Sequence, residues 1–293
     1  MARAAIDIGS NSVLLTVMER GRVLHDQATV VGLGRGLGDR GQFRPDRMER
    51  AREVLRGYVF RAAALGVPAY EIRAVATSGA RRASNAEAFF AALRQELGLK
   101  VRTVTGEEEA RLSYLGALHD LKLPGEPVLV VDLGGGSTEL ILGDHSGMRY
   151  KTSVELGAVR LTEAYGLDRD PGGLGACLEE IRDKLSAVIL PDDPASVVNV
   201  AGTATTLAGM QLGLQVYDGD RVHGSELSRD DLGRWVQRLR QASPQERRDL
   251  AALSPERADY LLAGASVLAE VLASAGADST LVSDGGLRLG LLR

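Results

Sequence analysis

The chain has 293 residues, enough for two domains of ordinary size, and its composition of 44% hydrophobic and 25% charged residues is that of a soluble globular protein. Its net charge of −4 argues against a protein that binds nucleic acid or a membrane surface through a basic face. The single cysteine, Cys177, excludes an internal disulfide framework and a cysteine-based zinc site.

Neither end of the chain carries a targeting or membrane pattern. Asp7 interrupts the first apolar run, so the N-terminus does not read as a secretory signal. The longest apolar stretch, residues 260–277, contains Glu270 and predicts a buried helix rather than a membrane span. We therefore expect a cytoplasmic protein with no membrane and no nucleic-acid partner.

Strand and helix patterns alternate along the first half of the chain. Three strands in a meander come first, and helices and strands follow in turn. The expected strands cover 3–9, 11–20, 21–34, 71–80 and 100–106; the expected helices cover 46–65, 84–98 with Ser84 or Asn85 as N-cap, and 106–121; a loop is expected over 76–85.

Residues 122–128, with two prolines and a glycine, predict a linker, and after it the same plan begins again. Strands are expected over 128–136, 137–144 and 147–157, followed once more by alternating helices and strands. This repetition predicts two similar α/β domains, residues 1–122 and 123–293, that face each other across a cleft.

In each half the first strand ends in an aspartate that is followed by a turn of small residues. Glycine and serine let a phosphate approach the backbone amides, which then form an anion-binding nest. Tight hairpin turns favour the same residues, but two matched turns favour phosphate binding. The expected phosphate-binding residues are Ser10, Asn11 and Ser12 in the first turn and Gly134, Gly135, Gly136 and Ser137 in the second.

The two aspartates, Asp7 and Asp132, would repel a phosphate unless a hard cation lay between them and it, or unless they oriented water. Glu139 lies on the returning strand, where strand alternation allows it to point to the side of Asp132, although a structural salt bridge is nearly as good an interpretation. We therefore expect Asp7, Asp132 and Glu139 to hold Mg²⁺ or another divalent cation.

Three further segments carry candidate residues. Thr105 and Glu108 fit a helix capping box, which leaves Glu109 as a candidate general base from weak spacing evidence alone. Arg81 follows a strand and is a candidate phosphate ligand, with a solvated surface arginine as the plainer interpretation. Gly202 and Thr203 begin a helix after a strand, which is another anion-binding arrangement.

Other catalytic patterns are absent from the sequence. It contains no G-x-x-x-x-G-K-[ST] segment, so it is not a P-loop protein. The four histidines are scattered, which argues against a histidine metal site or a serine–histidine triad. Only His223 lies in a polar loop where a functional role is expected.

These segments resemble, in order and spacing, the exopolyphosphatase/pentaphosphate phosphohydrolase (Ppx/GppA) family of the actin, sugar kinase and heat-shock ATPase superfamily. The most specific are "VVDLGGGSTELILG" and "VTGEEEARLSYLGA", and matching segments cover nearly the whole chain. The resemblance implies two ribonuclease-H-like domains and catalytic roles for three residues. In these roles Glu109 would be the general base, and Asp132 and Glu139 would hold Mg²⁺ or position the water.

The resemblance also implies phosphate binding by the Ser10–Ser12 and Gly134–Ser137 turns, with Arg81 assisting. The sequence departs from the family pattern at three places: Val13–Leu15 lacks a basic residue, "TSGAR" replaces "TSALR", and "SDGGLRLG" lacks two charges. These departures affect the expected details of phosphate-chain binding more than the hydrolytic centre.

We expect an exopolyphosphatase that hydrolyses terminal phosphate processively from inorganic polyphosphate. The first alternative is a pppGpp 5′-phosphohydrolase that produces ppGpp, and the second is a non-catalytic sensor of a phosphate ligand. A sugar kinase is a weaker alternative, because the matching motifs are those of hydrolases. A requirement for K⁺ stays open, and the apolar helix near the C-terminus makes a homodimer a reasonable expectation.

Overall fold

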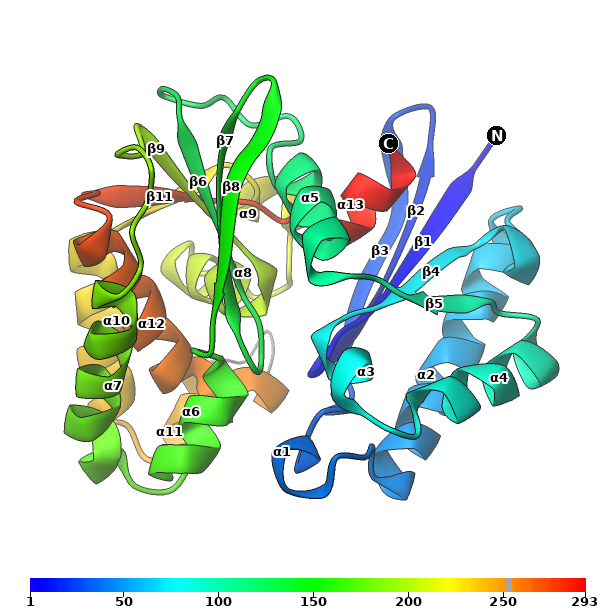
Figure 1. The fold of residues 1–293 in the computed structure, drawn as a ribbon, viewed down its shortest axis with the longest axis horizontal. Coiled ribbons are helices and arrows are strands. Elements are labelled where there is room, and N and C mark those ends of the chain that lie inside the picture. The colour runs from blue at the N-terminus through cyan, green and yellow to red at the C-terminus, as the bar shows by residue number, and fades with distance from the viewer. Residues whose placement is uncertain (251–254) are drawn as a thin grey trace. The chain divides into compact units, whose positions relative to one another are not determined.

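The computed structural model describes residues 1–250 and 255–293, which group by their contacts into two compact units. Unit 1 comprises Met1–Gly116 and Leu287–Arg293, and unit 2 comprises Ala117–Gly286. Figure 1 labels most of the helices and strands of both units. This grouping differs from the division between residues 122 and 123 expected above, because the C-terminal residues pack with unit 1.

Unit 1 contains a five-stranded sheet with the order β3-β2-β1-β4-β5. The first three strands form an antiparallel meander, while β4 and β5 run parallel to β1. Its elements are β1 (Arg3–Ile8), β2 (Ser12–Glu19), β3 (Arg22–Val30), α1 (Leu37–Arg40), α2 (Pro45–Ala64), the 3-10 turn η1 (Ala69–Glu71), β4 (Arg73–Ala76), α3 (Ser78–Arg82), α4 (Ala86–Leu97), β5 (Val101–Thr103), α5 (Gly106–Ala117) and α13 (Leu287–Leu292).

Unit 2 contains a six-stranded sheet with the order β10-β11-β9-β6-β7-β8. Its elements are β6 (Val128–Leu133), β7 (Thr138–Asp144), β8 (Gly147–Val154), α6 (Ala158–Tyr165), η2 (Pro171–Gly173), α7 (Leu174–Ser186), β9 (Ser196–Val200), α8 (Ala201–Gln211), α9 (Gly219–Val222), β10 (Ser225–Ser228), α10 (Arg229–Gln241), α11 (Pro244–Leu250), η3 (Pro255–Tyr260), α12 (Leu261–Ser274) and β11 (Ser279–Val282).

The two sheets share one topology. In unit 2, β8-β7-β6-β9-β11 repeats the order β3-β2-β1-β4-β5, with the same antiparallel and parallel pairings, and β10 is added beside β11. The predicted α/β class and the predicted repetition of an acid-tipped hairpin followed by helix–strand units are therefore confirmed.

One local prediction was wrong, and another was confirmed in position but not in its side-chain contact. Residues expected in a loop form the short helix α3, because five residues are too few to show a helical period in the sequence. Asn85 stands at the N-cap of α4 but caps nothing with its side chain. Its amide instead accepts a hydrogen bond from the Phe43 backbone N–H and donates one to the Phe43 carbonyl, both at 2.9 Å.

Each face of the sheet in unit 1 has its own hydrophobic core. Strand residues such as Ile6 and Ala74 pack with α2 and α4 on one face. On the other face a smaller core joins Ala5 and Val75 to α5 and α13. In unit 2, α12 is buried along most of its length, which confirms the predicted buried helix. Among the described helices none is both long and apolar enough to cross a membrane.

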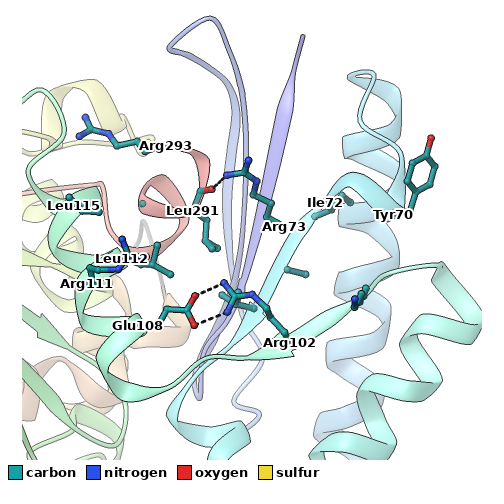
Figure 2. A pocket seen from close by; sticks show the side chains of 14 residues that line it. Tyr70, Ile72, Arg73, Arg102, Glu108, Arg111, Leu112, Leu115, Leu291 and Arg293 are labelled. Carbon is teal, nitrogen blue, oxygen red and sulfur yellow. Dashed lines mark hydrogen bonds and ion pairs between the residues drawn. The ribbon is translucent and has the colours of Figure 1, made fainter.

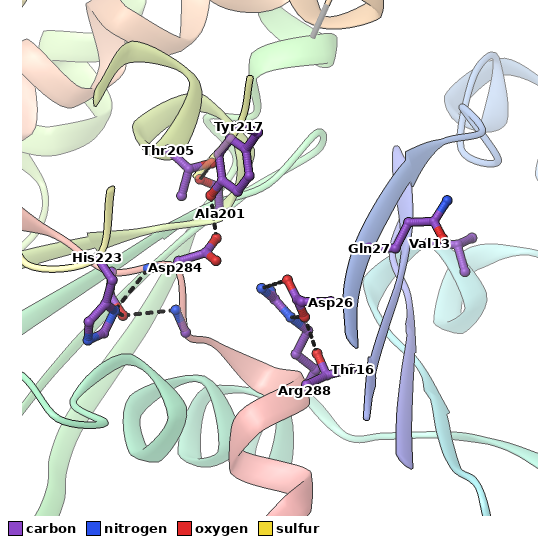
Figure 3. A network of polar contacts seen from close by, with 12 residues as sticks. Val13, Thr16, Asp26, Gln27, Ala201, Thr205, Tyr217, His223, Asp284 and Arg288 are labelled. Atoms are coloured by element: carbon purple, nitrogen blue, oxygen red, sulfur yellow. Dashed lines mark hydrogen bonds and ion pairs between the residues drawn. The ribbon is translucent and has the colours of Figure 1, made fainter. Parts of the chain in front are cut away.

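The C-terminal helix α13 is fastened to unit 1 by an ion pair and by close backbone packing. The Arg288 guanidinium donates two hydrogen bonds, of 2.9 and 2.8 Å, to the carboxylate of Asp26 on β3, and Asp26 also accepts one from Thr16 (Figure 3). A Cβ at Gly290 would lie 2.1 Å from the carbonyl oxygen of Leu112 on α5. Residue 290 must therefore be glycine for α13 to lie this close to α5.

Replacement of Arg288 by alanine is expected to destabilise unit 1, because it leaves the Asp26 carboxylate partly buried without its partner. The free energy of unfolding in urea should fall by about 2–4 kcal/mol. The control is Arg229→Ala, which removes an ion pair to the 93%-exposed Asp278 and should cost less than about 1 kcal/mol. Equal losses for the two variants would show that the Arg288–Asp26 pair does not anchor α13.

Candidate active site

The first candidate turn connects β1 to β2 and is held by a network of backbone hydrogen bonds. The Gly9 N–H donates to the Ser12 carbonyl at 2.9 Å. The Ser10 and Asn11 carbonyls accept from backbone N–H groups of the 31–34 loop at 2.6–2.9 Å. Because these carbonyls are used within unit 1, the turn has a fixed conformation before any ligand arrives.

Two glycines allow this turn to pack closely against its neighbours. A Cβ at Gly79, in the first turn of α3, would lie 2.8 Å from Ser10 Oγ, and one at Gly34 would lie 2.9 Å from Ser10 Cβ. The departure from the family pattern at "TSGAR" thus has a local reason, since glycine at 79 makes room for Ser10. The Asn11 Oδ1 atom is buried and accepts no hydrogen bond from the described residues.

The second candidate turn connects β6 to β7 and has the same geometry as the first. The Gly134 N–H donates to the Ser137 carbonyl at 2.9 Å, as Gly9 does to Ser12. The aspartate stands two residues before the glycine in both cases, Asp7 in β1 and Asp132 in β6. The two units therefore present the same acid-tipped turn at the same place in their sheets.

The second turn also packs against the start of α6. The Gly134 and Gly135 carbonyls accept hydrogen bonds of 3.0 Å from the Ala158 and Arg160 N–H groups. A Cβ at Gly157 would lie 2.3 Å from the Gly135 carbonyl oxygen, which is backbone and cannot move aside. The position of this turn thus depends on glycine at residue 157.

Asp132 and Glu139 are directly opposite each other in the antiparallel β6–β7 register. Residues paired in this way point to the same face of a sheet, so the two carboxylates share a side. Glu139 Oε1 accepts hydrogen bonds of 2.8 Å from Ser137 Oγ and Ser153 Oγ. These two hydroxyls orient the Glu139 carboxylate, and no salt bridge of the kind considered from the sequence is needed to explain its position.

In unit 1 the candidate base and a candidate phosphate ligand form an ion pair. Arg81 Nη1 donates to Glu109 Oε2 at 2.6 Å and to the Val104 carbonyl at 3.0 Å. The Glu109 side chain is only 12% exposed. The pair holds the carboxylate in one orientation, and it also means that a phosphate bound to Arg81 would compete with Glu109 for the guanidinium.

The neighbouring Glu108 has different contacts. Its backbone N–H is capped by Thr105 Oγ1 at 3.1 Å, which confirms Thr105 as a helix cap. Its carboxylate forms two hydrogen bonds with Arg102, at 2.6 and 2.7 Å, and this guanidinium lowers the pKa of Glu108 despite the opposing effect of desolvation. Glu108 and Glu109 are therefore held by different arginines.

At the third candidate site, the start of α8, the backbone has an unusual conformation. Ala201 adopts a φ of 69°, which is uncommon for a residue other than glycine. Gly202 lies against Arg257, since a Cβ there would be 2.2 Å from Arg257 Nη1. Thr203 is buried against Gly264 of α12, so a ligand would meet its backbone rather than its hydroxyl. Arg257 is an anion-binding candidate that sequence spacing could not identify.

His223 belongs to a polar cluster at the end of β11. Its Nδ1 accepts a hydrogen bond from the Asp284 N–H at 3.3 Å, and Tyr217 Oη donates to Asp284 Oδ1 at 2.6 Å (Figure 3). A Cβ at Gly219 would lie 2.7 Å from Asp284 Oδ2. Because Nδ1 accepts, the proton of a neutral His223 is on Nε2. The sequence pointed to His223 but not to Tyr217 or Asp284.

The Asp132 and Glu139 carboxylates supply only some of the ligands that a Mg²⁺ ion requires. Asp132 and Glu139 supply carboxylate oxygens, which Mg²⁺ prefers, from one face of unit 2. The described residues contain no group of three or more histidine, cysteine, aspartate or glutamate side chains placed to hold a metal ion. Mg²⁺ commonly takes one or two carboxylates and completes its shell with water and substrate phosphates, and this pair fits that pattern.

The whole chain is similar to known phosphatases. Exopolyphosphatase 2 of Mycobacterium tuberculosis is 36% identical over 96% of this chain and 94% of its own length. A guanosine-5′-triphosphate,3′-diphosphate pyrophosphatase of Photobacterium profundum is 28% identical over 99% of this chain but only 58% of its own length.

Solved structures show the same likeness. The crystal structure of the Ppx/GppA family member of Aquifex aeolicus superposes with a TM-score of 0.81 at 33% identity, covering 100% of this chain and 96% of that one. Residues 16–293 also match the family model of the Ppx/GppA phosphatase family. The chain therefore belongs to the Ppx/GppA phosphatase family, and it is a hydrolase.

Proposed function

We propose that this phosphatase is an exopolyphosphatase, which releases orthophosphate from the end of inorganic polyphosphate one unit at a time. The observation that carries the proposal is the repeated acid-tipped turn, with the same Gly9–Ser12 and Gly134–Ser137 hydrogen bond in both units. A substrate built only of phosphates suits a protein with two such turns, because each can bind phosphate oxygens through backbone amides.

In this proposal water attacks the terminal phosphorus, the bond to the bridging oxygen breaks, and the shortened chain leaves with the bridging oxygen. Glu109 takes the proton of the attacking water, and Arg81 orients its carboxylate through the 2.6 Å ion pair. Phosphoryl transfer needs positioning and charge neutralisation more than covalent chemistry, which these residues are suited to give.

Anion binding is assigned to residues of each unit. The Ser10–Ser12 turn binds phosphate in unit 1, together with the guanidinium nitrogens of Arg81 other than the Nη1 that contacts Glu109, and the Gly134–Ser137 turn binds phosphate in unit 2. In unit 2 the backbone amides at the start of α8, next to Arg257, also bind phosphate oxygens in this proposal.

Asp132 and Glu139 are the proposed ligands of Mg²⁺, and Asp7 marks the corresponding position in unit 1. When bound, the ion would neutralise phosphate charge that these carboxylates would otherwise repel. Ser137 and Ser153 contribute by holding Glu139 in place through their hydroxyls.

Hydrolysis of pppGpp is the second candidate, and the match to the Photobacterium profundum protein favours it. That match extends over 58% of the relative, whereas the match to exopolyphosphatase 2 extends over 94%. We therefore prefer polyphosphate to pppGpp as the substrate, because the chain covers nearly the whole length of exopolyphosphatase 2.

Phosphate release from polyphosphate, pppGpp, GTP and ATP should be compared under equal conditions with Mg²⁺. We expect the fastest release from long-chain polyphosphate, its loss on addition of EDTA, and its recovery when Mg²⁺ is restored. Faster release from pppGpp would instead assign the chain to guanosine pentaphosphate hydrolysis, and release that survives EDTA would remove the metal from the proposal.

Glu109→Gln should lower kcat by about 10²–10⁴-fold, the usual loss for a general base, because the amide cannot accept the proton of water. Binding of polyphosphate should stay near normal. Glu107→Gln is the matched control, since Glu107 is exposed on the same turn of α5. If both variants keep full turnover, Glu109 serves only to anchor Arg81.

Gly157→Ala should raise the KM for polyphosphate, because the added Cβ would meet the Gly135 carbonyl and push the second turn out of position. The control is Gly233→Ala in α10, where a Cβ would meet nothing within 4 Å. That variant should keep its KM and gain about 0.5–1 kcal/mol in stability. An unchanged KM in Gly157→Ala would separate this turn from substrate binding.

A further inference from the structure

Unit 1 contains a cavity that the proposed reaction does not use. It has a volume of about 560 Å³, within the range of small-molecule sites. Figure 2 shows it between the β4–β5 edge of the sheet and the helices α5 and α13. None of the candidate catalytic or phosphate-binding residues lines it.

The cavity exists because the helices cover this face of the sheet only in part. Ala5 and Val75 pack beneath α5 and α13, but the six-residue α13 is too short to cover the edge strand as well. Arg73 and Arg102, on β4 and β5, lie on the same face as Val75. Beside the hydrophobic core, this face of the sheet lines an apolar cavity, and the side chains of Arg73 and Arg102 lie at its edge.

The apolar part of the lining comes from three elements. Leu112 and Leu115 project from α5, Leu291 from α13, and Val75 from β4. This is enough hydrocarbon to bury a ring or a short chain, and burial of such a group favours binding.

The charged part of the lining is strongly positive. Arg73, Lys100, Arg102, Arg111 and Arg293 line the cavity, and Glu108 is its only carboxylate side chain among the described lining residues. The chain as a whole has a net charge of −4, so this excess is a local feature and not a reflection of overall composition. Lys100 is also one of only four lysines in the chain.

Two of these cations are held in place before a ligand arrives. Arg102 forms its two hydrogen bonds with Glu108, and Arg73 donates to the Leu291 carbonyl (Figure 2). Arg111 adds its charge near the same carboxylate, since it contributes to the lowered pKa of Glu108 after Arg102 and desolvation. One carboxylate thus stands among several cations, which leaves positive charge for an anion to neutralise.

Protection of the sheet edge does not explain this arrangement. A single charged side chain on an edge strand is enough to discourage pairing with another chain. It requires neither a cavity of this size nor leucines from two helices. An anion alone would not require the leucines either.

We propose that this cavity binds a small organic anion, in which a phosphate or carboxylate group is carried on an apolar body. The anionic group competes with Glu108 for Arg102 and is also attracted by the charge of Arg111. The apolar body lies against Leu112, Leu115 and Leu291. This binding does not depend on the proposed exopolyphosphatase activity.

Calorimetric titration with four probes tests the proposal. Phenyl phosphate and phenylacetate carry the two anionic groups on one ring, inorganic phosphate lacks the ring, and phenol lacks the charge. At least one of the two organic anions should bind about tenfold or more tightly than inorganic phosphate and phenol, because only they use both parts of the cavity. The tighter of the two identifies the anionic group.

Three variants locate the binding. Arg111→Ala should weaken it by about fivefold or more through loss of a cation, and Leu115→Trp should weaken it similarly by filling the hollow. Arg94→Ala, a surface arginine of α4 outside this cavity, and Arg81→Ala, in the candidate active site, should leave it unchanged.

Far-UV circular dichroism checks that Leu115→Trp folds. If that variant does not fold, the effect of Arg111→Ala alone decides whether the anion binds in this cavity. Failure of both organic anions to bind would overturn the proposal. So would binding that Arg81→Ala abolishes and Arg111→Ala leaves intact, because the anion would then occupy the candidate active site.

Discussion

Close approach of neighbouring glycines to the acid-tipped turns is the constraint on which the candidate site depends. Gly157 lies against the Gly135 carbonyl, and Gly79 and Gly34 lie against Ser10, at distances that no Cβ could occupy without displacing its neighbour. A phosphate site made of backbone amides has no side chain to adjust, so the positions of the amides must be set by packing. The glycines outside the turns are thus as necessary as those within them.

Much of the fold could be predicted because local sequence patterns indicate its strands and helices. Apolar runs ending in Asp7 and Asp132 revealed both hairpins, and their repetition revealed the shared topology. Strand alternation brought Asp132 and Glu139 to one face. Contacts between distant residues were beyond such patterns. Neither the Arg81–Glu109 pair nor the place of Arg257 beside Gly202 has a spacing that marks it, since each depends on how separate elements pack.

Helix α5 connects the two sites described in unit 1. Glu108 and Glu109 are adjacent, yet the first pairs with Arg102 at the cavity and the second with Arg81 at the candidate active site. Both acids lie in the first turn of α5, where they also stabilise the helix dipole. A ligand that draws Arg102 away from Glu108 would act on the same helical turn that positions Glu109. The cavity and the candidate active site therefore share one helical turn.

The return of α13 to unit 1 has a consequence for the order in which the protein is made. In the sequence, residues 117–286 separate the first part of unit 1 from α13, the helix that covers one face of its sheet. During synthesis the first sheet must therefore wait, with Ala5 and Val75 beneath an incomplete cover, while all of unit 2 emerges. Unit 2 is continuous in the chain, so its folding requires no distant segment. The cover of the first sheet, in contrast, is completed only when α13 has been made.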